Sequence, residues 1–268
     1  PVPKESRSWA YDRVANDPRT SQSLAILIDD YGNITRGAAV SYPRRVPAHA
    51  EQSVVACVVI ESNLVHFDAT ASGHRLGIPV EAKTWDLTGQ TPPLSNSFFS
   101  ASDVQTNFNS AATLNYEVAA TSGLQKRLVQ HECAQYYNNA ALAPLLQGTA
   151  DTRALLYKSY VLDMTPGLIS GAYAGKANSS ELDALVLEGK YVNLSAGMWV
   201  PSTSAATPAG HWLPSGHAVF NAGAFYLPSS VVDPFNNATT IAYDAYNLFA
   251  LTVTDPLANV VTATHDYR

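Results

Sequence analysis

The stretches Asp233-Pro234-Phe235-Asn236-Asn237 and Asp255-Pro256-Leu257-Ala258-Asn259 are two copies of one pattern near the end of the chain, and the second begins 22 residues after the first. In each copy the Asp supplies a side-chain acceptor, and the Pro fixes the backbone angle φ at the second position of a turn. The Asn tolerates left-handed geometry. Both stretches are therefore predicted to be turns.

β-branched and aromatic residues follow each predicted turn. Residues 238–242 lead to Tyr243-Asp244, and residues 260–264 lead to His265-Asp266-Tyr267. The expected order is turn, strand, turn, strand, with Tyr243, Asp244, Asp266 and Tyr267 near the strand ends. A repeat of this length is about one hairpin, which cannot bury its apolar face without neighbours on both sides.

A third turn of related sequence lies near the start of the chain. Residues 23–28 and 34–42 flank Asp29-Asp30-Tyr31-Gly32-Asn33, a hairpin signal with Gly32 and Asn33 at its tip. Neighbouring carboxylates on a strand would point to opposite faces, so Asp29 and Asp30 do not form a glycosidase acid–base pair. A turn role for Asp30 explains its position better.

The remaining sequence is predicted to be mainly β, with a few short helices. Tyr, Thr, Val and Ser are plentiful and turn residues recur at short intervals. Residues 53–60 form a nearly continuous apolar run, which indicates a strand buried on both faces. Residues 90–113 are the most loop-like segment and the best candidate for an insertion. For residues 123–137 a strand is favoured over a helix.

Two short helices are expected in the second half of the chain. Thr165 and Pro166 suit the N-cap and first position of one helix. Ser180-Glu181-Leu182-Asp183 opens another, and Gly189 ends it. Strands are expected at residues 153–164, 190–194 and 198–200.

The composition excludes several classes of partner. The net charge is −6 and charged residues make up 14% of the chain, without the clustered Lys and Arg that a nucleic-acid surface needs. No apolar run is long enough to span a bilayer, and no signal segment is visible. The chain begins without Met, so we interpret it as a piece of a longer protein.

Residues that could carry chemistry all have a structural explanation that we favour. Ser215, His217 and Asp233 could suggest a catalytic triad, but the chain contains no G-x-S-x-G motif. His211 and His217 lack an accompanying metal-binding pattern. The recurring Asp residues suit turns better than a calcium site. We therefore predict no catalytic, cofactor-binding or metal-binding residues.

The two cysteines, Cys57 and Cys133, are expected to be buried or half-buried free thiols. The sequence leaves a disulfide between them open.

The repeats resemble the Rhs/YD repeat, in which D-P-x-x-N is followed by Y-D. The usual Gly before the Asn is replaced by Asn236 in one copy and by Ala258 in the other. With further motifs in the family's order, the chain resembles the middle-to-C-terminal region of the B component of bacterial insecticidal toxin complexes, which is related to the SpvB family. These motifs are Asp30-Tyr31-Gly32-Asn33 with Ser41-Tyr42-Pro43-Arg44-Arg45, Pro79-Val80-Glu81-Ala82-Lys83-Thr84-Trp85-Asp86-Leu87-Thr88-Gly89, Lys126-Arg127-Leu128-Val129, Tyr157-Lys158-Ser159-Tyr160 with Thr165-Pro166-Gly167-Leu168, and Phe225-Tyr226-Leu227-Pro228.

The resemblance implies antiparallel hairpins that form part of a winding β shell, with residues 1–230 as the toxin-complex region and residues 231–268 as two YD-like repeats in one continuous unit. It implies a secreted, non-catalytic segment between a propeller and the main repeat spiral. The implied partners are the rest of the shell, a C-type component, an enclosed toxic effector and, indirectly, a pore-forming A component. No nucleic-acid or membrane contact is expected from this segment. The alternative from another class is a glycan- or ligand-binding β module that uses exposed Trp and Tyr. A hydrolase is disfavoured.

Overall fold

We describe the chain from a computed structural model, which defines residues 3–71, 73–92, 98–176, 179–194 and 210–267. Contacts between residues divide the chain into two units. The first consists of residues 1–132 and 164–174, and the second of residues 133–163 and 175–268. The division falls within two strands, at residues 132–133 and 163–164.

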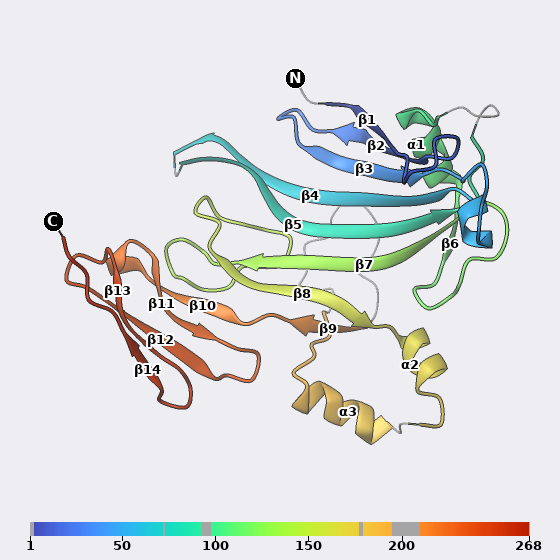
Figure 1. Cartoon of the computed structure of the whole chain (residues 1–268). Coiled ribbons are helices and arrows are strands. Elements are labelled where there is room, and N and C mark those ends of the chain that lie inside the picture. The colour runs from blue at the N-terminus through green and yellow to red at the C-terminus, as the bar shows by residue number, and fades with distance from the viewer. Residues whose placement is uncertain (1–2, 72, 93–97, 177–178, 195–209, 268) are drawn as a thin grey trace. The chain divides into compact units, whose positions relative to one another are not determined.

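The first unit is built on an antiparallel sheet whose strands follow in the order β1-β2-β3-β4-β5-β7, with the short β6 paired in parallel to β7 (Figure 1). Its elements are β1 (Glu5–Ala10), β2 (Arg19–Ile28), β3 (Ile34–Ser41), a 3₁₀ turn (Ala50–Ser53), β4 (Ala56–Thr70), β5 (Gly73–Thr88), α1 (Ala101–Ser110), β6 (Ala112–Leu114), β7 (Gln125–Tyr136) and α2 (Pro166–Ala172). The hairpin predicted around Asn33 is present as β2 and β3, and the strand predicted over residues 123–137 is confirmed as β7.

The pairing of β4 with β5 decides which side chains share a face. Cys57 lies opposite Leu87, and Glu61 lies opposite Lys83. Because paired residues project to the same side of a sheet, this face carries apolar residues at one end and charged residues further along.

Helix α1 covers the apolar end of this face. Val104 and Phe108 of α1 are buried against Val59, Leu87 and their neighbours in one hydrophobic core. The helix begins with a capping box, in which the Ser100 side chain accepts from the Asp103 backbone N–H at 3.1 Å and the Asp103 carboxylate accepts from the Ser100 N–H at 2.8 Å.

The expectation that residues 90–113 form a loop is therefore wrong for residues 101–110, which form α1, and for residues 112–113, which lie in β6. Its Ser, Asn and Thr residues suggested a loop, but Ser100 and Asp103 are a helix start, and burial of Val104 and Phe108 stabilises the helix against its modest intrinsic propensity.

The expectation that residues 53–60 are buried on both faces is also wrong. Along β4, Cys57 and Val59 are buried whereas Val58 and Ile60 are 38% and 48% exposed. An apolar run of β-branched residues does not by itself separate one buried face from two.

The second unit contains the end of β7, then β8 and β9, and a separate sheet with the order β10-β11-β12-β13-β14. Its elements are β8 (Leu156–Met164), α3 (Ser179–Glu188), β9 (His211–Pro214), β10 (His217–Asn221), a 3₁₀ turn (Ala222–Ala224), β11 (Leu227–Val232), β12 (Ala238–Tyr243), β13 (Ala250–Thr254) and β14 (Val260–Thr262).

Both predicted helices in the second half of the chain are present. The Thr165 hydroxyl accepts from the Leu168 N–H at 3.1 Å and caps α2, whose first residue is Pro166. Helix α3 ends one residue before Gly189. Of residues 190–194, only Val192 pairs, in an isolated bridge to Trp212. The strand expected at residues 198–200 lies outside the described residues.

The order of the second sheet follows the chain, because each strand pairs with the next through a hairpin. The turns at residues 233–237 and 255–259 join β11 to β12 and β13 to β14, as the repeat predicts. Asp266 and Tyr267 were expected at a strand end, but β14 stops at Thr262, so they lie beyond the strand. Among the described helices, none is long and apolar enough to cross a membrane.

Candidate functional site

The three turns singled out from the sequence have the same hydrogen bonds. In each, both backbone N–H groups two and four residues after an Asp donate to one of its carboxylate oxygens, and the amide of the final Asn donates to the other. The distances are 3.0, 2.8 and 2.9 Å for Asp29 with Tyr31 and Asn33, 2.8, 2.8 and 2.8 Å for Asp233 with Phe235 and Asn237, and 2.9, 2.8 and 2.7 Å for Asp255 with Leu257 and Asn259.

The turn at the start of the chain therefore uses Asp29, and the assignment of that role to Asp30 is corrected. Asp30 occupies the position that Pro234 and Pro256 hold in the other two turns, where the backbone angle matters and the side chain does not. In all three turns the residue before the Asn is left-handed, with φ of +88° at Gly32, +66° at Asn236 and +64° at Ala258. This is a three-residue hairpin loop, which needs a left-handed third residue.

Ala258 is strained in this position because its Cβ disfavours the left-handed region by about 1–2 kcal/mol. Replacing Ala258 by Gly is expected to raise the free energy of unfolding by about 0.5–1 kcal/mol, after the greater entropy of Gly in the unfolded chain is subtracted. The measurement is the urea midpoint, with Ala242→Gly in β12 as the matched control, which should lower it. A fall in stability for Ala258→Gly would contradict the expectation.

The Tyr and Asp residues that follow the turns are brought together. The Asp244 carboxylate accepts from the Leu248 N–H at 2.7 Å, the Phe249 N–H at 3.1 Å and the Tyr267 hydroxyl at 2.5 Å. The hydrogen bond from Tyr267, helped by the backbone N–H groups, lowers the pKa of Asp244. The Tyr243 hydroxyl instead donates to the Pro228 carbonyl at 3.1 Å. Asp244 thus holds the β12–β13 turn and fastens the end of the second repeat to the first.

The strongest electrostatic feature of the first unit was not identified from the sequence. It is a buried cluster, formed by Glu81 and Lys83 of β5 and His131 of β7, whose residues are 4%, 6% and 0% exposed. One oxygen of Glu81 lies 2.9 Å from the Lys83 Nζ and 2.7 Å from the His131 Nε2. The amide of Asn63 donates to the other oxygen. The carboxylate is therefore held from both sides.

The protonation states in this cluster follow from burial and neighbours. Burial alone would raise the pKa of Glu81, but hydrogen bonds and positive charge from its partners lower it to about 2. Burial also lowers the pKa of His131. Near neutral pH Glu81 is thus ionised, and a neutral His131 donates its Nε2–H to the carboxylate.

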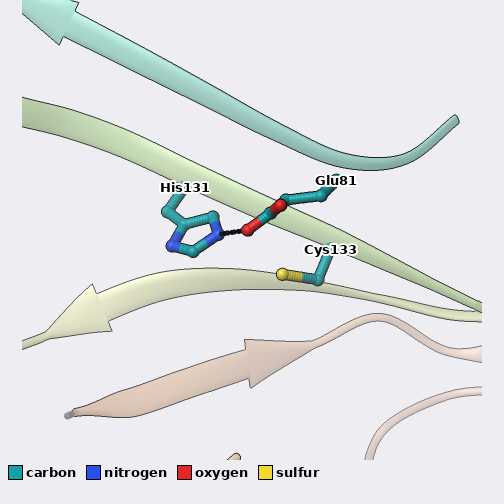
Figure 2. Close-up of side chains that lie close together, drawn as sticks. All are labelled: Glu81, His131 and Cys133. Carbon is teal, nitrogen blue, oxygen red and sulfur yellow. Dashed lines mark hydrogen bonds and ion pairs between the residues drawn. The ribbon is translucent and has the colours of Figure 1, made fainter. Parts of the chain in front are cut away.

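Cys133 follows His131 by two residues on β7, and Figure 2 shows its thiol beside the Glu81–His131 pair. The three side chains offer an oxygen, a nitrogen and a sulfur within 4.8 Å, which is the spacing of a metal site. However, the Lys83 ammonium already contacts the oxygen of Glu81 that a metal would use. A second cation there would be repelled, so the arrangement favours an ion pair over a metal ion.

The cluster makes stability depend on acid pH. The pKa of Glu81 falls from 4.5 to about 2 on folding, so its contribution is fully present above pH 4.5 and is lost as the pH drops towards 2. The full loss is up to about 3 kcal/mol. In urea titrations, the stability difference between the unmodified chain and Glu81→Gln should shrink across this range. A difference that stays constant from pH 6 to about pH 2.5 would contradict the assignment.

The residues considered for catalysis serve the backbone instead. The Ser215 hydroxyl accepts from the Ser159 N–H at 3.0 Å and donates to the Gly216 carbonyl at 2.6 Å. The His217 ring packs against Tyr157 at 5.0 Å, and Asp233 holds its own turn. The three residues therefore do not form a charge-relay chain.

Cys57 and Cys133 are both buried free thiols, as expected. Burial raises the pKa of Cys57 to about 11, which keeps it protonated and unreactive near neutral pH.

A signal for the buried cluster was present in the sequence. Glu81 and Lys83 are two apart, so in a strand their side chains share one face, and the apolar Trp85 and Leu87 continue that face. The partner His131 lies 50 residues further on, and no local pattern connects it to them.

Comparison with known proteins gives the family context. Residues 1–72 match the family model described as the middle/C-terminal region of the insecticide toxin TcdB. The resemblance to a toxin-complex B component is confirmed. No curated protein matches the chain.

Solved structures of toxin complexes match nearly the whole chain. A Photorhabdus luminescens Tc holotoxin pore matches 98% of it with a TM-score of 0.75 and 18% identity, and a TcdB2-TccC3 crystal structure matches 98% with a TM-score of 0.68 and 18% identity. TcdB2-TccC3-Cdc42 matches the same share with a TM-score of 0.64. The chain spans only 12–14% of the length of these proteins. These likenesses show the fold, which is mainly antiparallel β as predicted.

Proposed function

We propose that this chain is a non-catalytic segment of the wall of a B-type toxin-complex shell, which encloses a toxic effector protein. The likeness to TcdB2-TccC3 structures supports this proposal, and one feature of the second sheet carries it. The sheet grows by one hairpin at a time, in chain order, with the same turn used at residues 233–237 and 255–259. Such an array is extended by adding further hairpins.

The last strand in this array leaves an edge for such an addition. Within the described residues, β14 pairs with β13 on one side, and Val260 and Val261 are 57% and 70% exposed. β-branched residues on an open edge favour pairing with another strand. We infer that the next hairpin of a continuous wall covers this edge. In such a wall, residues 1–230 and 231–268 would belong to one structural unit.

The absence of catalysis is part of the proposal. Glu81 and His131 are buried and paired with each other, and Ser215 is engaged by backbone groups. These contacts support a structural role for the three side chains. The mechanism in this proposal is containment, in which strand pairing closes the wall and one face of the sheet meets the enclosed protein. The purified chain should turn over no substrate beyond the rate of a heat-inactivated sample.

The proposal includes partners and location. The partners are the rest of the shell, a C-type component with YD repeats, the effector and, indirectly, a pore-forming A component. The complex acts outside the cell that makes it. TccC3 is named together with TcdB2 in the similar structures, which supports a C-type partner.

The test of the proposal is the association state. The chain alone is expected to form larger species as its concentration rises, and Val261→Lys should reduce this because a charged edge opposes strand pairing. Val231→Lys in β11, whose backbone is paired on both sides, is the matched control and should leave association unchanged. Size-exclusion chromatography with light scattering measures both.

A chain that stays monomeric at every concentration would contradict the wall proposal and favour a self-contained ligand-binding module. A chain that becomes monodisperse when extended by the hairpins that follow it in its parent protein would support the wall.

A further inference from the structure

The first unit contains a pocket lined by aromatic rings and prolines near its outermost strand. Trp9 of β1, Tyr42 and Phe98 contribute rings, Pro18 and Pro43 contribute rigid walls, and Arg44 and Arg45 also line the pocket, whose volume is about 440 Å³. Trp9 is 47% exposed, which is unusual for the largest apolar side chain.

The rings are held in place without a ligand. The Tyr42 hydroxyl accepts from the Phe99 N–H at 2.9 Å and donates to the Gln22 side chain. The Phe98 ring packs edge-on against Tyr42 at 5.0 Å and against Trp9 at 6.2 Å. A pocket whose walls are already ordered loses little entropy when it binds.

The two arginines of the lining differ in whether a carboxylate already neutralises their charge. Arg44 is paired with Asp17, with its Nε 2.9 Å from the carboxylate. Arg45 is exposed, and its guanidinium donates to the Asn16 carbonyl at 3.2 Å; among the described residues, no carboxylate forms an ion pair with it. Arg45 can therefore bind a carboxylate of a ligand by donating two parallel hydrogen bonds to it.

We propose that this pocket binds an extended polypeptide segment that carries a proline and, nearby, an acidic residue. Grooves lined with Trp, Tyr and Pro recognise proline in its extended helix, which is already ordered and packs its ring against aromatic faces. Arg45 supplies the charge complement for the acidic residue.

The lining favours a peptide over a sugar. A sugar site needs several amide or carboxylate side chains to match the hydroxyl groups, and none of the described lining residues carries one. The polar side-chain groups of the lining belong to Trp9, Thr20, Tyr42, Arg44 and Arg45, and those of Tyr42 and Arg44 are already engaged. The inference does not depend on the shell proposal, because the pocket lies within the first unit and does not involve the edge of β14.

The test measures binding of labelled synthetic peptides to the 268-residue chain immobilised on a biosensor, which prevents self-association from hiding the result. The peptides carry one or two prolines and one or two glutamates at varied spacing. Trp9→Ala is expected to weaken the best peptide about tenfold, as truncation of an aromatic anchor does. Tyr11→Ala is the matched control, because Tyr11 is 53% exposed but does not line the pocket, and this variant should bind as the unmodified chain does.

Reversing the charge of Arg45 tests whether it recognises the acidic residue of the peptide. Arg45→Glu should lower affinity for the glutamate peptides by at least about fivefold and raise it for the same peptides with lysine, while Arg13→Glu should change neither. Unchanged binding in Trp9→Ala, binding that ignores the proline, or binding of oligosaccharides in place of peptides would each overturn the proposal. The proposal would also be overturned if no peptide bound to a chain that urea unfolding shows to be folded.

Discussion

Replacing Glu81 by Gln is expected to lower the free energy of unfolding by about 3 kcal/mol or more. The substitution keeps the shape of the side chain but removes the negative charge, so the buried Lys83 ammonium loses the carboxylate that lies 2.9 Å from it. Breaking a buried ion pair from one side costs about 3–5 kcal/mol, because the remaining charge retains its desolvation penalty. Urea unfolding at neutral pH measures the loss.

Two further variants show whether the uncompensated charge is the cause. Adding Lys83→Met to Glu81→Gln should restore most of the stability, because the buried ammonium that lost this carboxylate is then removed as well. Glu132→Gln is the matched control, because Glu132 is exposed on β7 and its change should stay within about 0.5 kcal/mol. A loss below about 1 kcal/mol for Glu81→Gln would show that the pair behaves like a surface ion pair.

Replacing Phe108 by Ala is expected to lower the free energy of unfolding by about 3–5 kcal/mol, as does removal of a buried aromatic side chain from a core. Phe108 is buried and fastens α1 to the sheet: its ring packs edge-on against Trp85 at 5.8 Å, and Arg36 and Lys126 lie over it at 4.7 and 4.3 Å. The Lys126 ammonium also donates to the Phe108 carbonyl at 2.8 Å, near the negative end of the helix.

Phe108→Leu separates packing from the attraction between the cations and the ring. Leu keeps much of the apolar volume but removes the aromatic face, so Phe108→Leu should lower the free energy of unfolding by less than Phe108→Ala does. The part of this decrease that the smaller volume does not explain measures the cation–ring contacts. Phe235→Ala at an exposed hairpin tip is the control and should change stability by less than about 0.5 kcal/mol. Equal stability of Phe108→Ala and the unmodified chain would mean that α1 does not stabilise this sheet.

The turns are the part of the molecule that the sequence determined by itself. The Asp, Pro and Asn of each copy act within five consecutive residues, so their hydrogen bonds and backbone angles follow from local chemistry. The caps of α2 and α1 are local in the same way, although the second was overlooked because its helix is rich in Ser, Asn and Thr. The placement of Asp29 in the turn was missed by one residue, since Asp29 and Asp30 are chemically alike.

Contacts between residues far apart in the sequence were decided only by the tertiary structure. Burial of β4 on one face depends on α1, which packs on that side and leaves Val58 and Ile60 exposed. The pairing of Glu81 with His131 brings together residues 50 positions apart on two strands. The contact of Tyr267 with Asp244 depends on how the chain turns after β14. Sequence patterns encode which face a side chain takes along a strand, but the partner across the sheet is fixed only when the strands pair, because the pairing depends on the whole fold.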